Sequence, residues 1–267
     1  MNKFRLILLL TASFLASCQM EYSPYAVDLH GVDINGTAEN LDVLQENSST
    51  EFQSFTFVVM ADTHHYYSQL EDAVSHINRD DSIEMVLIAG DLTNRGLKQE
   101  FMWAQERLDK LNVPYLTVIG NHDALANGVE LYKKIFGKLN YSFVYHNVKF
   151  IVHNNNNWEF HSSNVPDLDW LEQELLDANQ YTHVIVMSHV PVDDNARFDQ
   201  QIQDRYHALL FSYDVSLYLN GHQHGYANRF NLAGTGVHHI TIGSVSKSSY
   251  IKVSVASDEV GVELVNY

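Results

Sequence analysis

The sequence predicts one large α/β domain, and two observations support this. Apolar, β-branched runs that are typical of buried strands recur along the chain, and in its first half they alternate with segments of helical apolar spacing. Polar residues follow several of these runs directly, at intervals of about 30 residues, the length of a β-α-β unit. The predicted domain covers residues 54–267, and no internal repeat is found.

The first half of this domain is predicted to contain three strands separated by two helices. The strands are expected at residues 55–61, 85–89 and 115–119, and the helices at residues 68–79 and 98–111. Polar blocks that begin at Asp62, Gly90 and Gly120 follow the three strands. Because parallel strands place their carboxyl ends at one edge of a sheet, we expect these blocks to lie together.

The second half contains more strands than helices. Strands are predicted at residues 141–145, 148–152, 182–187, 215–219, 239–242, 250–256 and 260–265. One helix is predicted at residues 167–178, with Pro166 near its first turn. Because several strands follow one another without an intervening helix, this half is expected to be more antiparallel.

Five polar blocks in a fixed order supply side chains that bind metals. They are Asp62-Thr63-His64, Gly90-Asp91, Gly120-Asn121-His122-Asp123, Ser188-His189 and Gly221-His222-Gln223-His224. Each block alone is common, and isolated histidines and asparagines are more often core or turn residues. Five ordered blocks, each after an apolar run, instead indicate enough oxygen and imidazole ligands for two divalent cations, an arrangement that hydrolyses phosphate esters.

This ordered set resembles the pattern of the calcineurin-like metallophosphoesterases, D-x-H, G-D, G-N-H-D/E, H and G-H-x-H, and all five blocks match it. The resemblance implies a four-layer α/β/β/α sandwich of two mixed sheets. It also implies two metal sites that share Asp91, an anionic bridge that offsets the repulsion between the cations. One site would be held by Asp62, His64, Asp91 and His224, and the other by Asp91, Asn121, His189 and His222.

The implied ligands contain nitrogen and oxygen but no sulfur, which favours Mn, Fe, Zn or Ni over Mg or Ca alone. A water shared by two such ions loses a proton near neutral pH and attacks phosphorus as a metal-bridging hydroxide. His122 is not a ligand in the family pattern, so we expect it to protonate the leaving group or stabilise the transition state, with Asp123 accepting its ring N–H. The alternative is that His122 only braces the turn at Asn121.

Three further residues are candidates for substrate binding. Asn94 and Arg95 follow the second block and are placed to contact the phosphate, although Asn94 is equally suited to cap the helix after it. His65 is next to a ligand and is expected to line the pocket. Asn94 stands where purple acid phosphatases have a ligating tyrosine, and the second block is more similar to small bacterial phosphodiesterases of the cyclic-nucleotide and glycerophosphodiester type.

The other polar and aromatic residues are expected to lie at the rim of the site or in the core. His153 and the asparagines at 154–157 follow a predicted strand and are expected at the substrate rim. Trp103, Trp158 and Trp170 are expected in the core rather than in a base-stacking platform. Nothing in the sequence identifies the organic part of the substrate.

The first residues have the pattern of an export signal. Lys3 and Arg5 precede an apolar run that is too short for a membrane span, and Leu15-Ala16-Ser17-Cys18 resembles a bacterial lipobox. We therefore expect a lipoprotein signal peptide at residues 1–17 and a lipidated Cys18 that anchors an exported protein in the cell envelope. The alternative is a cleaved signal with an incidental cysteine. Cys18 is the only cysteine, so no disulfide is expected.

An acidic segment at residues 18–53 is predicted to link this signal to the domain. Between residues 19 and 53 it carries seven acids and no Lys or Arg, which is typical of a solvated tether. Its apolar residues predict that part of it docks on the domain, with a short helix near residues 38–46.

The formal charge of −17 makes long nucleic acids poor partners unless the field is locally reversed. Removal of residues 1–17, with Lys3 and Arg5, makes it two units more negative. The first hypothesis is a lipid-anchored enzyme that hydrolyses small phosphodiesters or monoesters. The alternatives are a nuclease of the same superfamily, which the acidic surface disfavours, and a catalytically idle binding lipoprotein, which the complete set of seven candidate ligands disfavours.

Overall fold

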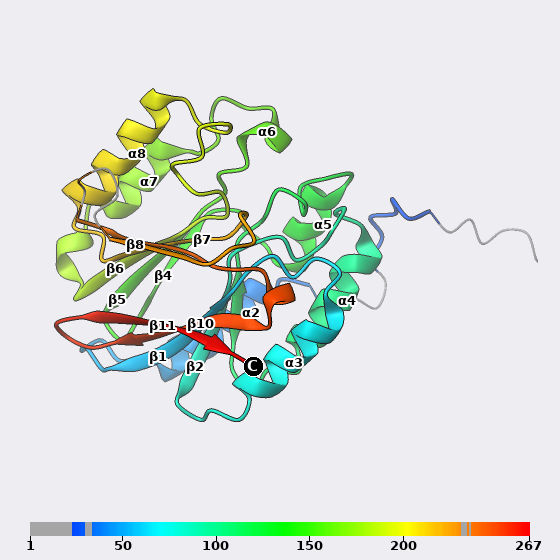
Figure 1. Cartoon of the computed structure of the whole chain (residues 1–267), viewed down its shortest axis with the longest axis horizontal. Coiled ribbons are helices and arrows are strands. Elements are labelled where there is room, and N and C mark those ends of the chain that lie inside the picture. Colours follow the sequence, from blue (N-terminus) through cyan, green and yellow to red (C-terminus); the bar gives the residue numbers. More distant parts are fainter. Residues whose placement is uncertain (1–22, 30–33, 231–233, 235) are drawn as a thin grey trace, which may run out of the picture.

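The computed structural model describes residues 23–29, 34–230, 234 and 236–267. The predicted signal peptide and Cys18 lie outside these residues. Two mixed sheets stack face to face, and helices cover both outer faces (Figure 1). This is the expected α/β/β/α sandwich. Among the described residues, no helix has the length and apolar character to cross a bilayer.

The first sheet has the strand order β11-β10-β1-β2-β3. Its parallel strands are β1 (Phe55–Met60), β2 (Ile83–Ile88) and β3 (Tyr115–Thr117), joined through the predicted helices α3 (Tyr67–Ile77) and α4 (Lys98–Leu108). The antiparallel strands β10 (Ser249–Val255) and β11 (Val260–Asn266) extend the sheet beside β1. The short helix α5 (Gly128–Ile135), which the sequence analysis does not predict, follows β3.

The second sheet has the order β4-β5-β6-β7-β9-β8. Its strands are β4 (Tyr141–Tyr145), β5 (Val148–Val152), β6 (His183–Met187), β7 (Leu217–Asn220), β8 (Ala227–Phe230) and β9 (His238–Thr241). The expectation of a more antiparallel half is wrong for its centre, because β5, β6, β7 and β9 are parallel. Between β7 and β9 the chain returns through β8, which is antiparallel to β9. Helical crossovers impose the parallel direction of β5, β6 and β7. They contain α6 (Asn157–Phe160), α7 (Leu168–Leu175), η1 (Ala178–Gln180) and the unpredicted α8 (Gln200–Ser212).

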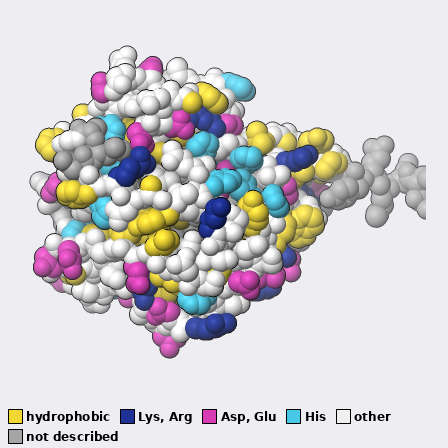
Figure 2. All heavy atoms as spheres, in the orientation of Figure 1, with side chains coloured by type: hydrophobic (Ala, Val, Ile, Leu, Met, Phe, Trp, Pro, Cys, Tyr) yellow, Lys and Arg dark blue, Asp and Glu magenta, His cyan; other side chains and the backbone are white. Residues whose placement is uncertain are grey.

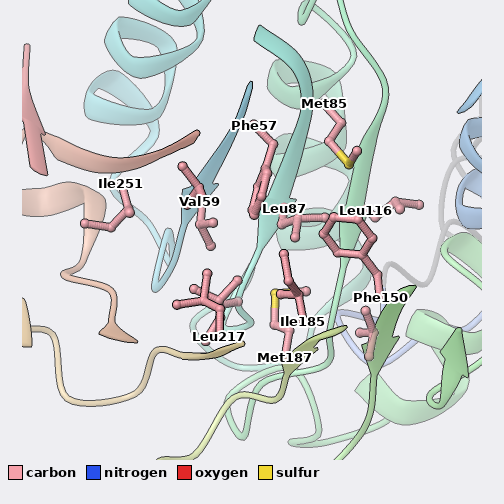
Figure 3. Close-up of a cluster of buried hydrophobic side chains, with 14 of the residues drawn as sticks. Phe57, Val59, Met85, Leu87, Leu116, Phe150, Ile185, Met187, Leu217 and Ile251 are labelled. Atoms are coloured by element: carbon pink, nitrogen blue, oxygen red, sulfur yellow. The ribbon is translucent and has the colours of Figure 1, made fainter. Parts of the chain in front are cut away.

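Strands with two buried faces explain why the sequence reads as continuous apolar runs. In β1, Phe57 and Val59 point into the space between the sheets, whereas Val58 and Met60 pack against the outer helices. Side chains from both sheets fill the space between them (Figure 3). A separate apolar cluster joins the second sheet to α7 and α8. Both sheets are thus held firmly, and their strand ends are fixed relative to one another.

The acidic N-terminal segment contains the predicted helix, α2 (Gly36–Asn47). This helix lies against β3 and β4, which are edge strands of the two sheets. Leu44 is 3% exposed and joins the core between the sheets, and the Asn40 side chain accepts a hydrogen bond from the Tyr115 backbone N–H. Upstream, Val27 packs against the core beneath the outer helices. The segment is therefore part of the folded body at these points.

Candidate metal centre

Two buried carboxylates follow the central strands of the first sheet. Asp62 comes just after β1, and Asp91 comes just after β2. Gly90 has a φ of +90°, and a Cβ on it would lie 2.4 Å from His189 Nδ1. Only glycine therefore allows the second block to approach His189 this closely.

The third block approaches Asp91 from β3. A Cβ on Gly120 would lie 2.1 Å from Asp91 Oδ1, so glycine is needed there as well. This approach lets the His122 backbone N–H donate a hydrogen bond of 2.8 Å to Asp91 Oδ1. The Asp91 carboxylate is thus oriented by the backbone that also carries Asn121.

Three of the four candidate histidine ligands come from the second sheet, whereas His64 follows β1 of the first. His189 follows β6, and His222 and His224 follow β7. The His222 backbone N–H donates to the Asp62 carboxylate at 3.1 Å from Oδ2. This hydrogen bond ties the loop after β7 to the loop after β1, so the two sheets contribute to one site. Figure 2 shows histidine side chains gathered near the middle of one face of the molecule.

Sharp backbone turns bring these side chains together. Five of the seven candidate ligands have positive φ angles, a region that costs non-glycine residues about 1–3 kcal/mol each. Asp and His tolerate it better than branched residues do. The five are Asp62 (52°), His64 (42°), Asp91 (56°), His222 (70°) and His224 (55°).

The ligands form two adjoining groups. In each group the ligand atoms lie within 4.8 Å of one another. The groups are Asp62, His64, Asp91 and His224, and Asp91, His189 and His222. The side-chain oxygen of Asn121 joins the second group, at 3.0 Å from His189 Nε2 and 2.9 Å from His222 Nδ1. All seven residues that the family pattern implies as ligands are therefore brought together.

Asp91 belongs to both groups. Its Oδ2 lies 3.6 Å from His64 Nε2 in the first group and 3.3 Å from His189 Nε2 in the second. A carboxylate in this position can contact two cations at once and supplies negative charge between them. The geometry agrees with the bridging role that the family resemblance implies.

The hydrogen bonds of the histidine rings fit a pair of cations. The Nδ1–H of His64 donates to the Thr93 carbonyl at 3.0 Å, and that of His189 donates to the Ala89 carbonyl at 2.7 Å. These partners fix the tautomers, so each neutral ring presents a lone pair on Nε2. His64 Nε2 faces His224 Nε2 at 3.2 Å, so these two ring nitrogens are close enough to contact one cation.

The electrostatics of the site also call for positive charge. Burial, together with Asp91, raises the pKa of Asp62 to about 8. Burial lowers the pKa of His64 to about 4 and that of His222 to about 4, which keeps both rings neutral. Burial alone would also lower the pKa of His189, but the Asp91 carboxylate raises it to about 9. Divalent cations would allow Asp62 to ionise beside the charged Asp91 and would replace the proton on His189.

The structure corrects the role expected for Asp123. Its buried carboxylate accepts hydrogen bonds from the backbone N–H groups of Leu92, Thr93 and Gly120 and from the Thr93 hydroxyl. It therefore joins the second block to the third and does not orient the His122 ring. The His122 Nδ1–H instead donates to the backbone carbonyl of Asn94 at 2.8 Å. Burial and the nearby Asp91 raise the pKa of Asp123 to about 6.

Of the three residues expected at the substrate, Asn94 contacts His122, and the other two are exposed. Asn94 orients His122 through its carbonyl, and it does not cap α4, whose N-cap is Leu97. Arg95 is exposed, three residues before α4. His65 is also exposed, and its ring lies 4.6 Å from that of Tyr66.

Sequence reasoning missed the residues that brace the ligands from behind. Asn155 donates to the Val190 carbonyl at 2.6 Å and accepts from the Val190 N–H at 2.9 Å, which fixes the chain on the far side of His189. The run at 154–156 is buried, and so is His153, which contacts Tyr206, so these residues do not form a rim. The low-complexity run marks the place, but the contacts depend on backbone atoms that a sequence pattern cannot show.

The tryptophan expectation is also wrong in part. Trp158 is 52% exposed and Trp103 is 42% exposed, whereas Trp170 packs against the cluster beneath α7 and α8.

Comparison with known proteins places these features in a class. The sequence pattern of the calcineurin-like phosphoesterases matches residues 55–226. Among solved structures, the purple acid phosphatase PPD1 from yellow lupin (Lupinus luteus) seeds is similar at 15% identity with a TM-score of 0.65, over 82% of this chain and 53% of that one. This chain thus spans about half of the lupin protein. No curated protein sequence matches.

Two further structures share the fold. A dimetal phosphatase from Danio rerio is 16% identical with a TM-score of 0.58, over 78% of this chain and 98% of that one. GAP50, described as the anchor in the inner membrane complex of Plasmodium, is 17% identical with a TM-score of 0.62, over 80% and 84% of the two chains. The fold and the two adjoining ligand groups define a metallophosphoesterase with a candidate dimetal site. This chain belongs to the calcineurin-like phosphoesterase family.

Proposed function

We propose that the protein hydrolyses small phosphodiesters or monoesters with two divalent ions of Mn, Fe, Zn or Ni. The observation that carries the proposal is the position of Asp91 Oδ2, which faces a histidine of each ligand group. His64 and His224 complete the first group with Asp62, and the second is completed by Asn121, His189 and His222. When bound, two such ions neutralise phosphate charge and lower the pKa of a water molecule.

The chain's own groups then act on the leaving side of the ester. Because the His122 Nδ1–H is held by the Asn94 carbonyl, Nε2 is the nitrogen left for the substrate. A protonated His122 donates from Nε2 to the departing oxygen, and the carbonyl stabilises the charged ring through Nδ1. The His122 ring lies 4.7 Å from that of His64, so this proton is delivered beside the first ligand group.

Location forms a second part of the proposal. The Leu15-Ala16-Ser17-Cys18 sequence supports a lipid on Cys18, which would hold the enzyme at a membrane in the cell envelope. The small esters proposed as substrates would then be found outside the cytoplasm. The strongly acidic composition supports a small substrate over a long nucleic acid.

The test is an Asp91→Asn variant, measured for metal content and for turnover of a panel of aryl phosphate mono- and diesters with each added metal. An amide cannot supply the bridging charge, so we expect loss of at least one metal and nearly complete loss of turnover. Asp193→Asn is the matched control, because Asp193 pairs with Arg229. Two retained metals with normal turnover would refute the assignment of Asp91. A native protein that is inactive on the whole panel would refute the proposed hydrolysis.

A further inference from the structure

An exposed tryptophan, Trp158, is connected to the second ligand group through intervening contacts. The Asn156 side chain donates to the Ile119 carbonyl at 2.8 Å, directly before the Gly120-Asn121 turn. Trp158 lies in α6, two residues after the buried Asn156, and its side chain is 52% exposed. The backbone that presents Trp158 is therefore fixed to the loop that presents Asn121.

A buried ion pair supports the Trp158 ring. The Arg197 guanidinium lies 4.4 Å from the centre of the ring. Arg197 Nη1 donates to both carboxylate oxygens of Glu159, at 2.7 and 2.9 Å, and the Arg197 side chain is only 7% exposed. Since the charge of Arg197 is matched by Glu159, this arginine is occupied as a support for the indole and is not presented to a phosphate.

The same turn reaches a candidate metal ligand. The Arg197 backbone N–H donates to Asp194 Oδ1 at 3.2 Å, and Asp194 Oδ2 lies 3.7 Å from His222 Nε2. Trp158 is thus linked to the second ligand group from two directions, through Asn156 and through the turn at 194–197. An exposed indole that is this rigidly supported loses little conformational freedom when it binds a ligand.

We propose that Trp158 stacks against a planar aromatic group carried by the phosphoester substrate, either an aryl group or a nucleobase, on the side of His222. The inference rests on the proposed function and names the substrate class of that site. Indole and aromatic rings stack in offset or edge-to-face geometry, and stacking tolerates different rings because each has a π-face. Arg197 strengthens the platform by covering one side of the indole.

The test measures binding, so that it does not depend on turnover. Calorimetry on metal-loaded protein gives the dissociation constants of methylphosphonate, phenylphosphonate and a nucleoside 5′-phosphonate. We expect the aromatic ligands to bind more tightly than methylphosphonate. In Trp158→Ala this preference should fall about tenfold, because stacking on an aromatic side chain contributes on the order of a factor of ten in affinity. The affinity for methylphosphonate and the metal content should stay unchanged. If phenylphosphonate loses more affinity than the nucleoside 5′-phosphonate, the aromatic group of the substrate is an aryl group; if the nucleoside 5′-phosphonate loses more, it is a nucleobase.

Two variants complete the design. Trp158→Phe should retain most of the preference, because a phenyl ring still stacks. Trp103→Ala should retain all of it, because Trp103 is a second exposed tryptophan, 42% exposed, on α4 and packs beside Tyr67. The proposal is overturned if native protein shows no aromatic preference, if neither class of phosphonate binds, or if Trp158→Ala keeps the preference. If native protein prefers aromatic ligands but turns over none of the phosphoesters, the result counts against the proposed hydrolysis alone.

Discussion

The orientation of individual histidines separates ligands from the candidate acid. His64 and His189 both direct Nδ1 at a backbone carbonyl and Nε2 into a ligand group. His122 also directs Nδ1 at a carbonyl, but it belongs to neither ligand group. The same kind of hydrogen bond thus orients two rings of the candidate metal centre and the ring of the proposed acid.

His122→Ala should keep both metals and lose rate chiefly for substrates with alkoxide leaving groups. General acid catalysis contributes about 10²–10⁴-fold, and a nitrophenolate needs little of it. The measurement is kcat/KM against leaving-group pKa on metal-saturated protein. His189→Ala, the comparison, should lower metal content and slow all substrates together. Equal losses across leaving groups in His122→Ala would show that His122 positions the substrate or stabilises phosphoryl charge.

His153 should make the metal-free protein sensitive to acid. Burial lowers the pKa of this ring to about 4 from 6.5, so between these values the unfolded chain binds a proton that the folded chain does not. Stability from His153 is therefore complete above pH 6.5 and is lost as the pH falls towards 4. Between pH 7 and pH 5 the loss is about 2 kcal/mol.

The check is urea unfolding of native protein and His153→Asn at both pH values, with chelator present. The variant should lose about 2 kcal/mol less over this interval, since Asn carries no titrating group. Equal pH dependence of the two proteins would contradict the assignment. Other buried histidines are common to both proteins and cancel in the comparison.

At the scale of elements, the sequence predicted the ligand-bearing strands because their signal is local. A run such as β1 is apolar on both faces and ends where Asp62 begins. Helix α8 was missed because Gln203 and His207 occupy buried positions and interrupt its apolar period. Strand β8 was also missed, because it is a half-exposed strand at the edge of the sheet and carries no continuous apolar run. Without α8, the parallel direction of β6 and β7 could not be inferred.

Helix α2 should contribute to the stability of the whole domain. Leu44 is 3% exposed between the edges of the two sheets, whereas Val43 on the same helix is 44% exposed. Leu44→Ala should lower the free energy of unfolding by about 2–5 kcal/mol, the usual cost of truncating a buried leucine. Val43→Ala, measured in the same denaturant series, should change it by no more than about 0.5 kcal/mol. Equal effects would mean that α2 is a detachable part of the tether.

At the scale of the whole molecule, the seven candidate ligands could be identified from order and residue type alone, and the structure brings them together, whereas their supports could not be predicted. Asp123, Asn155 and the Asn94 carbonyl act through backbone atoms, and pairing of that kind leaves no residue signature. The Trp158 ring is supported by Arg197, which lies 39 positions further along the chain. Distances of this kind are set by the sheet, not by neighbouring residues.

Attachment of the protein to a membrane is tested by changing Cys18. If Cys18 carries a lipid, Cys18→Ser should release the protein from membranes or mislocalise it, because stable attachment requires the acyl chains. Fractionation of cells that express each form, followed by detection of the protein, measures this. Unchanged membrane partitioning of Cys18→Ser would show that the lipobox interpretation is wrong.

The contribution of both sheets to each ligand group has a further consequence. Asp62 and His64 lie in the loop after a strand of the first sheet, and His224 lies after a strand of the second. A cation shared between them is a cross-link between the two halves of the sandwich, one that forms and dissolves with the free metal concentration. Each tenfold rise in that concentration above the dissociation constant adds about 1.4 kcal/mol per ion against unfolding. The stability of the folded chain would therefore follow the metal supply of its surroundings.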